Sequence, residues 1–411
     1  MNRSTPRLAA LALALTLSAC SKDKVCAPDE TKIGDTCYAL RSDPNNCGSR
    51  GNVCSASQGC FSGACVECAS SGGACSASVV AACYNLNQAR PLASSLEPAN
   101  IPLATDAGPI AFARLGDQLF VANSTSSTIS LVPAASGGSS ITVPNGGAPF
   151  SDLEHVAAHD GLLWVSNAAT GTLVAIDPAS GTAKDEIPLA QTPTEFVNPQ
   201  GIDFIGTKGY LALSGVNAIA VLDLSAIPGK VTKRIDLSGQ ATGAASAAPA
   251  RVLAVGNRVY VTMNDLYDPT FTPVAGAHGK LAVIDPATDT LAGAALDLGA
   301  ECWNASGIAV SGTKLWIACG FYDLFGSQTV SGAAVVPVEL ASGTPVVGTP
   351  IPLSNAATSI AICDGRVYAG ASDSGNVLSF DLANPTLIST ALACPPAPGK
   401  GSYVPALACA R

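Results

Sequence analysis

Two histidines stand close together in a pattern that could hold a metal ion. His155 and His159 are four positions apart in a run that predicts a β-strand, so both side chains point to the same side of it. Imidazoles with nearby carboxylates are typical ligands of a hydrolytic divalent metal. The residues that could form such a site are Glu154, His155, His159, Glu195 and Asp203. The alternative is two polar residues in a solvated channel, because no third ligand has a recognisable spacing.

Familiar catalytic motifs are absent from the sequence. There is no G-x-S-x-G elbow, no HExxH helix and no Walker A loop, and the third histidine, His278, stands apart from the other two. The sequence therefore assigns no catalytic residue, no metal ligand and no cofactor.

The chain contains 15 cysteines, and the first of them follows an export signal. Arg3 and Arg7 precede an apolar run from Leu8 to Leu17, which is too short to span a bilayer, and small residues lead to Cys20. An exported chain meets an oxidising environment, so the 14 remaining cysteines predict disulfides.

The stretch "LSAC" resembles the bacterial lipoprotein signal, in which the cysteine thiol is acylated and the preceding peptide is removed. The resemblance implies a signal peptide over residues 1–19 and a lipid on Cys20. Ser21, where some lipoproteins have Asp, favours the outer membrane by resemblance to enterobacterial sorting. The lipid would hold the protein on that membrane, on its periplasmic or cell-surface side.

Residues 20–76 are rich in cysteine and have almost no alternating apolar pattern, which predicts a small spacer stapled by disulfides. Zinc binding by Cys65 and Cys68 is the competing interpretation, although no second pair of ligands matches it. The stretch "DPNNCGSRGNVCSASQGCFSGACV" resembles the stigma-specific-protein-like repeats of myxobacterial secreted proteins. It has Arg50 where that pattern has a further cysteine, so no pairing is carried over.

From residue 77 to 411 one unit recurs: a strand, a tight turn, and a second strand with an aromatic residue. The aromatic positions, 44 to 56 residues apart, are Phe120, Trp164, Tyr210, Tyr260, Trp316 and Tyr368. A third strand follows and ends at Asp177, Asp223, Asp285 or Asp381, where a turn cap is expected. Four antiparallel strands per repeat predict the blades of an all-β β-propeller. Motifs such as "LVAIDPASGTAKDEIPL" resemble the YVTN and surface-layer repeats of bacteria.

Six repeats are complete, and the two ends of the domain supply the parts of one more. "VPALAC" near the C-terminus matches a first strand, whereas "SVVAACYN" near residue 80 matches a second strand. We expect a blade built from both ends, hence seven blades, with six as the alternative. The repeat alignment predicts two disulfides, Cys302 with Cys319 and, in the closing blade, Cys83 with Cys394.

Long loops of two neighbouring blades and the connection between them carry an unusual share of the aromatic residues. We predict that they meet on one face as a partner-binding surface formed by Tyr267, Phe271, Trp303, Phe321, Tyr322 and Phe325. The alternative is that these rings only pack the loops onto the blades.

Composition narrows the possible functions. Charged residues are 12% of the chain and the net charge is -9, so no basic footprint for nucleic acid exists. We expect a membrane-anchored, extracytoplasmic lipoprotein whose propeller is a non-catalytic binding or scaffold module for a protein or glycan. The alternative is a propeller hydrolase or lactonase with a metal in its central channel. The fold alone is not evidence for that activity, because one fold supports many functions.

Overall fold

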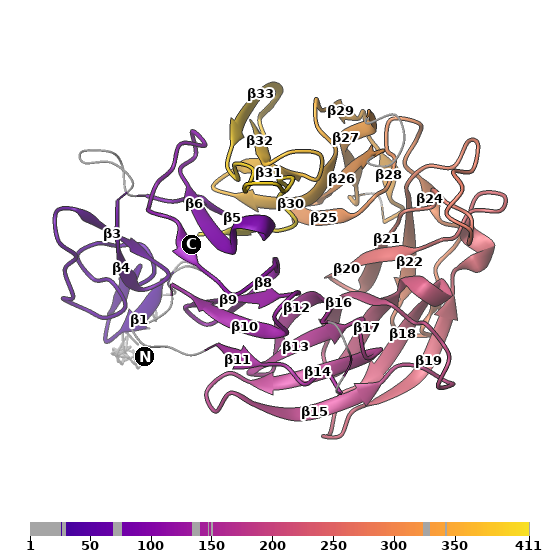
Figure 1. Cartoon of the computed structure of the whole chain (residues 1–411), viewed down its shortest axis with the longest axis horizontal. Coiled ribbons are helices and arrows are strands. Elements are labelled where there is room, and N and C mark those ends of the chain that lie inside the picture. Colours follow the sequence, from indigo (N-terminus) through magenta and orange to yellow (C-terminus); the bar gives the residue numbers. More distant parts are fainter. Residues whose placement is uncertain are drawn as a thin grey trace, which may run out of the picture.

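The computed structural model describes residues 26, 30–68, 76–133, 140–146, 148, 151–323, 329–341 and 343–410. Within these ranges the chain is all-β, with three short 3-10 turns, η1 (Tyr84–Leu86), η2 (Ser214–Val216) and η3 (Ser238–Gln240), and no α-helix. Seven antiparallel sheets stand around one central axis (Figure 1). The protein is therefore a seven-bladed β-propeller, and the alternative of six blades is wrong.

Six blades run outward from the axis in the order of the chain, and the closing blade begins with the last strand, β34. The innermost strands are β8 (Pro109–Leu115), β12 (Leu153–His159), β16 (Pro199–Ile205), β20 (Pro249–Val255), β25 (Gly307–Ser311), β30 (Ala357–Cys363) and β34 (Leu407–Cys409). The second strands are β9 (Gln118–Asn123), β13 (Leu162–Asn167), β17 (Lys208–Leu213), β21 (Arg258–Met263), β26 (Lys314–Tyr322), β31 (Arg366–Ala371) and β5 (Val79–Cys83).

The outer half of each blade is more variable. The third strands are β10 (Thr128–Val132), β14 (Thr172–Asp177), β18 (Ala218–Asp223), β22 (Lys280–Asp285), β27 (Val330–Glu339), β32 (Asn376–Asp381) and β6 (Gln88–Leu92). The outermost are β11 (Ile141–Thr142), β15 (Thr182–Pro188), β19 (Lys230–Asp236), β23 (Thr290–Leu291) with β24 (Leu296–Asp297), β28 (Val346–Val347) with β29 (Ile351–Pro352), β33 (Asn384–Leu392) and β7 (Leu103–Ala104).

The closing blade combines both ends of the domain, as the repeat alignment predicts. Its sheet has the order β34-β5-β6-β7, with Ala408 opposite Val80. Cys83 and Cys394 form a disulfide across this junction. A further disulfide joins Cys363 to Cys409 and so ties β34 to β30 of the preceding blade. The ring is thus closed by strand pairing and by two covalent links, and it leaves no free inner edge.

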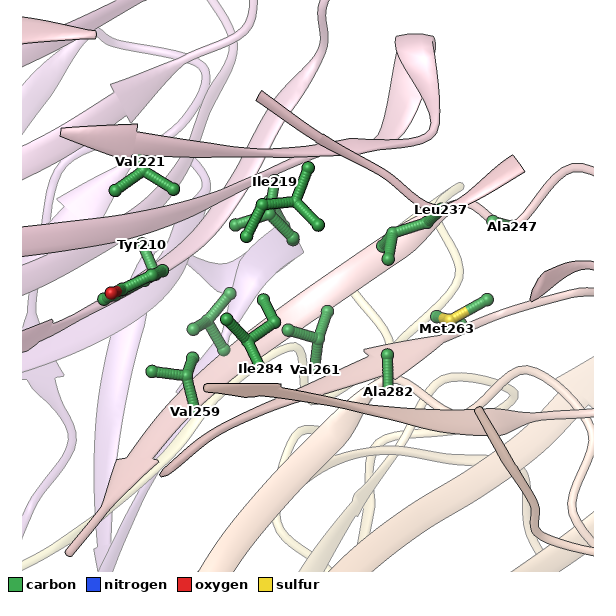
Figure 2. Close-up of a cluster of buried hydrophobic side chains, with 13 residues drawn as sticks. Tyr210, Ile219, Val221, Leu237, Ala247, Val259, Val261, Met263, Ala282 and Ile284 are labelled. Atoms are coloured by element: carbon green, nitrogen blue, oxygen red, sulfur yellow. The ribbon is translucent and has the colours of Figure 1, made fainter. Parts of the chain in front are cut away.

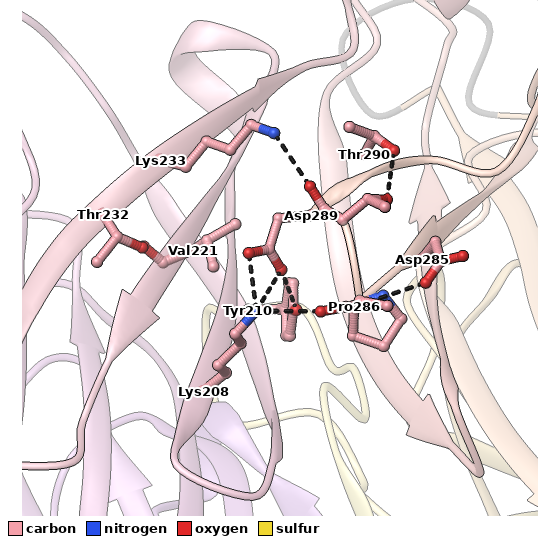
Figure 3. A network of polar contacts seen from close by, with 11 residues as sticks. Lys208, Tyr210, Val221, Thr232, Lys233, Asp285, Pro286, Asp289 and Thr290 are labelled. Carbon is pink, nitrogen blue, oxygen red and sulfur yellow. Dashed lines mark hydrogen bonds and ion pairs between the residues drawn. The ribbon is translucent and has the colours of Figure 1, made fainter.

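Aromatic second-strand residues fill the space between blades. Tyr210 is fully buried and packs with Val221, Val259 and Ile284 in the core between two neighbouring sheets (Figure 2). Its hydroxyl donates a 2.5 Å hydrogen bond to Asp289 of the next blade, which also accepts from Lys208 (Figure 3). Burial of the hydroxyl is the main cause that raises the pKa of Tyr210, and the hydrogen bond with Asp289 is the second. The repeated aromatic position is therefore a packing position.

The aspartates that end the third strands cap turns, as expected from the sequence. Each carboxylate accepts a hydrogen bond from the backbone N–H two residues further on, for example Ala179 N–H to Asp177 at 2.9 Å and Ala287 N–H to Asp285 at 2.9 Å. Asp223 and Asp381 make the same contact. These residues stabilise local turns.

The cysteine-rich segment packs against the propeller. It forms two hairpins, β1 (Thr31–Ile33) with β2 (Thr36–Tyr38) and β3 (Gln58–Phe61) with β4 (Ala64–Glu67), which lie beside the closing blade (Figure 1). Phe61 is 2% exposed and joins a core that includes Val80 and Leu119 of two blades. Ile101 N–H also donates to the Glu67 carbonyl at 3.2 Å. Residues 30–68 are therefore docked on the ring.

Disulfides staple this segment. Its pairs are Cys26–Cys37, Cys47–Cys60 and Cys54–Cys65, and Cys68 is disulfide-bonded as well. The zinc interpretation of the Cys65 and Cys68 pair is wrong, because a disulfide sulfur is not a thiolate ligand. The expected signal peptide and Cys20 lie outside the described residues. In the part of the chain that the structure describes, no helix is long and apolar enough to cross a membrane.

Candidate functional site: the central channel and the aromatic face

The innermost strands of all seven blades enclose a cavity of about 380 Å³ on the axis of the propeller. Aliphatic side chains and polar groups share its wall about equally, and Ile202, Val252, Ile308 and Ile360 are among the aliphatic lining residues. Each innermost strand contributes side chains to the wall, because equivalent positions of the seven strands face the axis. A compact ligand with an apolar body fits such a cavity.

At one height along the axis, the equivalent positions of the seven innermost strands differ in the size of their side chains. The repeat places seven residues at this level, one from each innermost strand: Ala111, His155, Gly201, Arg251, Gly307, Ser359 and Ala406. Five of them are small, so they leave room on the axis. Only His155 and Arg251 are large, and they come from the blades on either side of Gly201.

Arg251 lies over Gly201, which belongs to the blade between Arg251 and His155. A Cβ built at Gly201 would lie 2.9 Å from the Arg251 Cα and 3.1 Å from its Cδ, so the absence of a side chain at 201 admits the arginine. The charge of Arg251 acts on both Glu154 and His155 of strand β12. No hydrogen bond or ion pair with another described residue occupies its guanidinium group, which therefore has free donors at the cavity wall.

Glu154 lies next to this arginine at the start of β12, where the strand has a bulge between Leu153 and His155. The pKa of the Glu154 carboxyl is raised to about 7, mainly by burial and then by the charge of Asp152, while the charge of Arg251 and a hydrogen bond with Gln200 oppose the shift. Glu154 is therefore close to half protonated near neutral pH, so its charge responds to a nearby anion.

His155 faces the cavity as a neutral imidazole. Burial and then the charge of Arg251 lower its pKa to about 3. Its Nδ1 atom is buried and has no hydrogen-bond partner in the described structure. An unsatisfied buried polar atom of this kind points to a partner that the described residues do not supply.

Asp203 also lines the cavity, but both of its carboxylate oxygens are used. Oδ1 accepts from Phe204 N–H and Oδ2 from Ala254 N–H, each at 2.8 Å, which links two innermost strands. His159 stacks on Phe204 with ring centroids 4.2 Å apart, and its Nε2 lies 3.3 Å from Asp160. The prediction that the two histidines share a channel site fails at His159, because the neighbouring blade covers its ring.

The remaining acid and histidine lie elsewhere. Glu195 is outside the channel lining and binds Arg234, with Oε1 2.7 Å from Nη1. His278 contacts Asp297 at 3.1 Å. Among the described residues, every group of three or more close metal-ligand atoms contains disulfide-bonded cysteines and no channel residue. The proposed metal-ligand set therefore does not fit a metal site.

The expected aromatic face brings its three segments together. Tyr267 meets the edge of Phe321 with ring centroids 5.6 Å apart, and Trp303 stacks on Phe321 at 6.5 Å. Tyr322 pairs with Val330 at the end of the β26–β27 hairpin, while Phe325 lies outside the described residues. Trp303 also covers Gly332, where a Cβ would meet its ring. Trp303 therefore packs the loops as well as lying on the face.

Phe271 differs from the other rings, because its side chain is 84% exposed. It sits at φ 62°, in the left-handed region that a bulky residue rarely adopts. The turn is fixed by Asp268, whose Oδ1 accepts from the backbone N–H groups of Thr270 at 2.8 Å and Thr272 at 2.9 Å. Phe271 N–H also donates to the Asp268 carbonyl at 2.9 Å. A rigid turn thus presents a phenyl ring to solvent.

Comparison with known proteins shows the fold alone. No protein-family model and no curated protein matches the chain. A protein from Lactobacillus plantarum is similar in structure, with 12% identity, a TM-score of 0.57, and 81% of this chain and 99% of that chain covered. A putative 6-phosphogluconolactonase from Bacteroides uniformis has 12% identity and a TM-score of 0.55, with 81% of this chain and 99% of that chain covered. A catalytically inactive variant of virginiamycin B lyase from Staphylococcus aureus, solved with quinupristin, gives 15%, 0.50, 69% and 83%.

Sequence reasoning missed Arg251, which lines the channel, and Gly201, over which Arg251 lies. The signal was present in the repeat, because aligning the innermost strands places Arg251 and His155 at equivalent positions otherwise held by small residues. The second strands, with their aromatic residues, are easier to align. They determine the packing between blades, whereas the innermost strands determine the cavity.

Proposed function

We propose that the protein is an extracytoplasmic lipoprotein that binds an envelope protein or glycan, without catalysis, through its aromatic face. The aromatic face is the surface formed by the loops that carry Tyr267, Phe271, Trp303, Phe321 and Tyr322. The observation that carries the proposal is the 84% exposure of Phe271 on a hydrogen-bonded turn beside the packed rings. Exposed aromatic side chains on rigid loops bury a large area on binding at a small entropic cost.

Sedimentation of the Cys20→Ser protein, which cannot carry the lipid, with the envelope fraction of the native bacterium tests this function. Phe271→Ser should weaken binding at least about ten-fold, because a hot-spot side chain is lost. Phe196→Ser is the matched control, since Phe196 is 67% exposed on another loop. Protease or periodate treatment of the fraction distinguishes a protein from a glycan partner. Equal loss of binding in both variants, or no loss in either, would contradict the proposal.

Attachment through Cys20 is part of the same proposal. Its support is the export signal, together with six disulfides in the described residues, which require an oxidising compartment. Intact mass spectrometry of the mature protein should show a chain that begins at Cys20 and carries acyl groups. Cys20→Ser should release the protein from the membrane. A mature chain that begins elsewhere would remove the anchor from the proposal.

A channel hydrolase or lactonase remains the second candidate. The putative lactonase and the lyase variant described above share only the fold with this chain, so they support this candidate no further. Its metal-dependent form lacks support in the site, because the ligand set does not fit.

A further inference from the structure

Arg251 is the one residue of the channel wall that combines a permanent charge with free hydrogen-bond donors. Its side chain lies over Gly201, and its charge acts on Glu154 and His155 two blades away. A guanidinium group forms paired hydrogen bonds with planar anions, and carboxylates match its geometry. The adjacent His155 Nδ1 is also without a partner. The polar side of the cavity is therefore suited to an anionic head group.

The rest of the wall defines the body of the ligand. Beyond the level of Arg251, aliphatic side chains such as Ile308 and Ile360 line the cavity of about 380 Å³, together with Asp203, whose carboxylate oxygens both accept backbone hydrogen bonds. The small residues at the other ring positions leave the axis open at the level of Arg251. An inorganic anion would leave this apolar surface without a contact, whereas an organic acid would fill it.

We propose that the central channel binds a small organic carboxylate, with its head group on Arg251 and His155 and its apolar body along the aliphatic wall. This site is separate from the aromatic face and does not depend on the function proposed for that face. Binding requires no catalytic step.

Glu154 makes the site sensitive to pH. Bound carboxylate adds a negative charge beside Arg251, which disfavours ionised Glu154 and draws a proton onto it. The other charged or titratable groups near Glu154 are Asp152 on the chain before β12, Arg251 on β20, His155 on β12 and Tyr403 before β34. His155 stays neutral near neutral pH. Burial lowers the pKa of Arg251, but a guanidinium group keeps its proton in proteins, so Glu154 dominates the response.

Benzoate and its neutral counterpart benzamide test the site on the intact protein by ligand-observed NMR titration. Benzoate should bind with a Kd of about 1 mM or tighter, and benzamide at least about ten-fold more weakly. Arg251→Gln should remove benzoate binding. Arg258→Gln is the matched control, because Arg258 lies on the same blade and pairs with Asp285 at 3.4 Å, away from the channel lining. Circular dichroism checks that each variant folds.

Glu154→Gln gives a result that a purely structural residue would not give. The wild-type protein should bind benzoate about ten-fold more tightly at about pH 6 than at about pH 8, and this difference should disappear in the variant. Three results would overturn the proposal: no saturable benzoate binding, equal binding of benzamide, or benzoate binding that survives in a folded Arg251→Gln protein. Displacement of benzoate by inorganic phosphate at equal affinity would show a general anion site, and it would overturn the proposal that the ligand is an organic carboxylate.

Discussion

Cys83, at the end of strand β5, is bonded to Cys394, 311 positions further along the chain, and both residues are 1% exposed in the core of the closing blade. This bond joins the start of the propeller to its last segment. The Cys302–Cys319 bond, with a separation of 17 residues, occupies the equivalent place inside a single blade. The same local geometry therefore closes a hairpin in one blade and the whole ring in another.

Removing the ring-closing bond should cost much more stability than removing its equivalent. On the loop-entropy model, the long crosslink contributes about 6 kcal/mol and the short one about 3 kcal/mol. We expect the Cys83→Ala, Cys394→Ala double variant to show the larger fall in urea midpoint, with faster hydrogen exchange in β5 and β34. The Cys302→Ala, Cys319→Ala variant is the control. Equal losses would show that ring closure depends on strand pairing alone.

The sequence was sufficient to predict the blades because the information for them is local. Alternating apolar residues, Gly turns and terminal aspartates lie within each repeat, as the turn at Asp177 illustrates. Even the shared blade follows, since its parts match the complete repeats. The docking of the cysteine-rich segment has no such signal, because Phe61 contributes to a core formed by distant strands.

Truncating Phe61 should release the cysteine-rich segment from the ring. Phe61 is 2% exposed between the closing blade and β9, so Phe61→Ala should cost about 3 kcal/mol of docking free energy. Hydrogen exchange at β9 and β3 should speed up while the inner strands keep their protection. Val53→Ala is a suitable control, because Val53 is 64% exposed in the same segment. Unchanged exchange in both variants would mean that the segment is held by its other contacts, such as the 3.1 Å pair of Arg41 and Asp117.

The channel site was only partly predictable for a related reason. Glu154 and His155 were identified as possible chemical groups, but Arg251, whose charge acts on them, comes from two blades further on and lies over Gly201. Spacing along one strand also predicts a shared face for His155 and His159, yet Phe204 of the next blade stacks on His159. Contacts between blades decide both results, and single-strand patterns contain no information about them.

Glu154 should make the protein less stable as the pH rises through neutrality. Its pKa is raised from 4.5 to about 7 in the folded state, mainly by burial. Below the unfolded pKa both states hold the proton, so the group has no effect on stability. Between the two pKa values the unfolded state loses the proton first and gains stability, and above about pH 7 the full penalty is present.

Glu154→Gln should therefore stabilise the protein at alkaline pH and leave it nearly unchanged at acid pH. One pKa unit corresponds to about 1.4 kcal/mol, so the gain at about pH 8 is at most about 3 kcal/mol and should vanish near pH 4. His155→Gln is the opposite control: because the pKa of His155 is lowered to about 3, its unfolded state takes up a proton first, and the variant should gain stability only on the acid side. Urea midpoints measured across this pH range distinguish the two. A Glu154→Gln gain that is independent of pH would mean that the substitution improves packing and that the carboxyl does not titrate near neutrality.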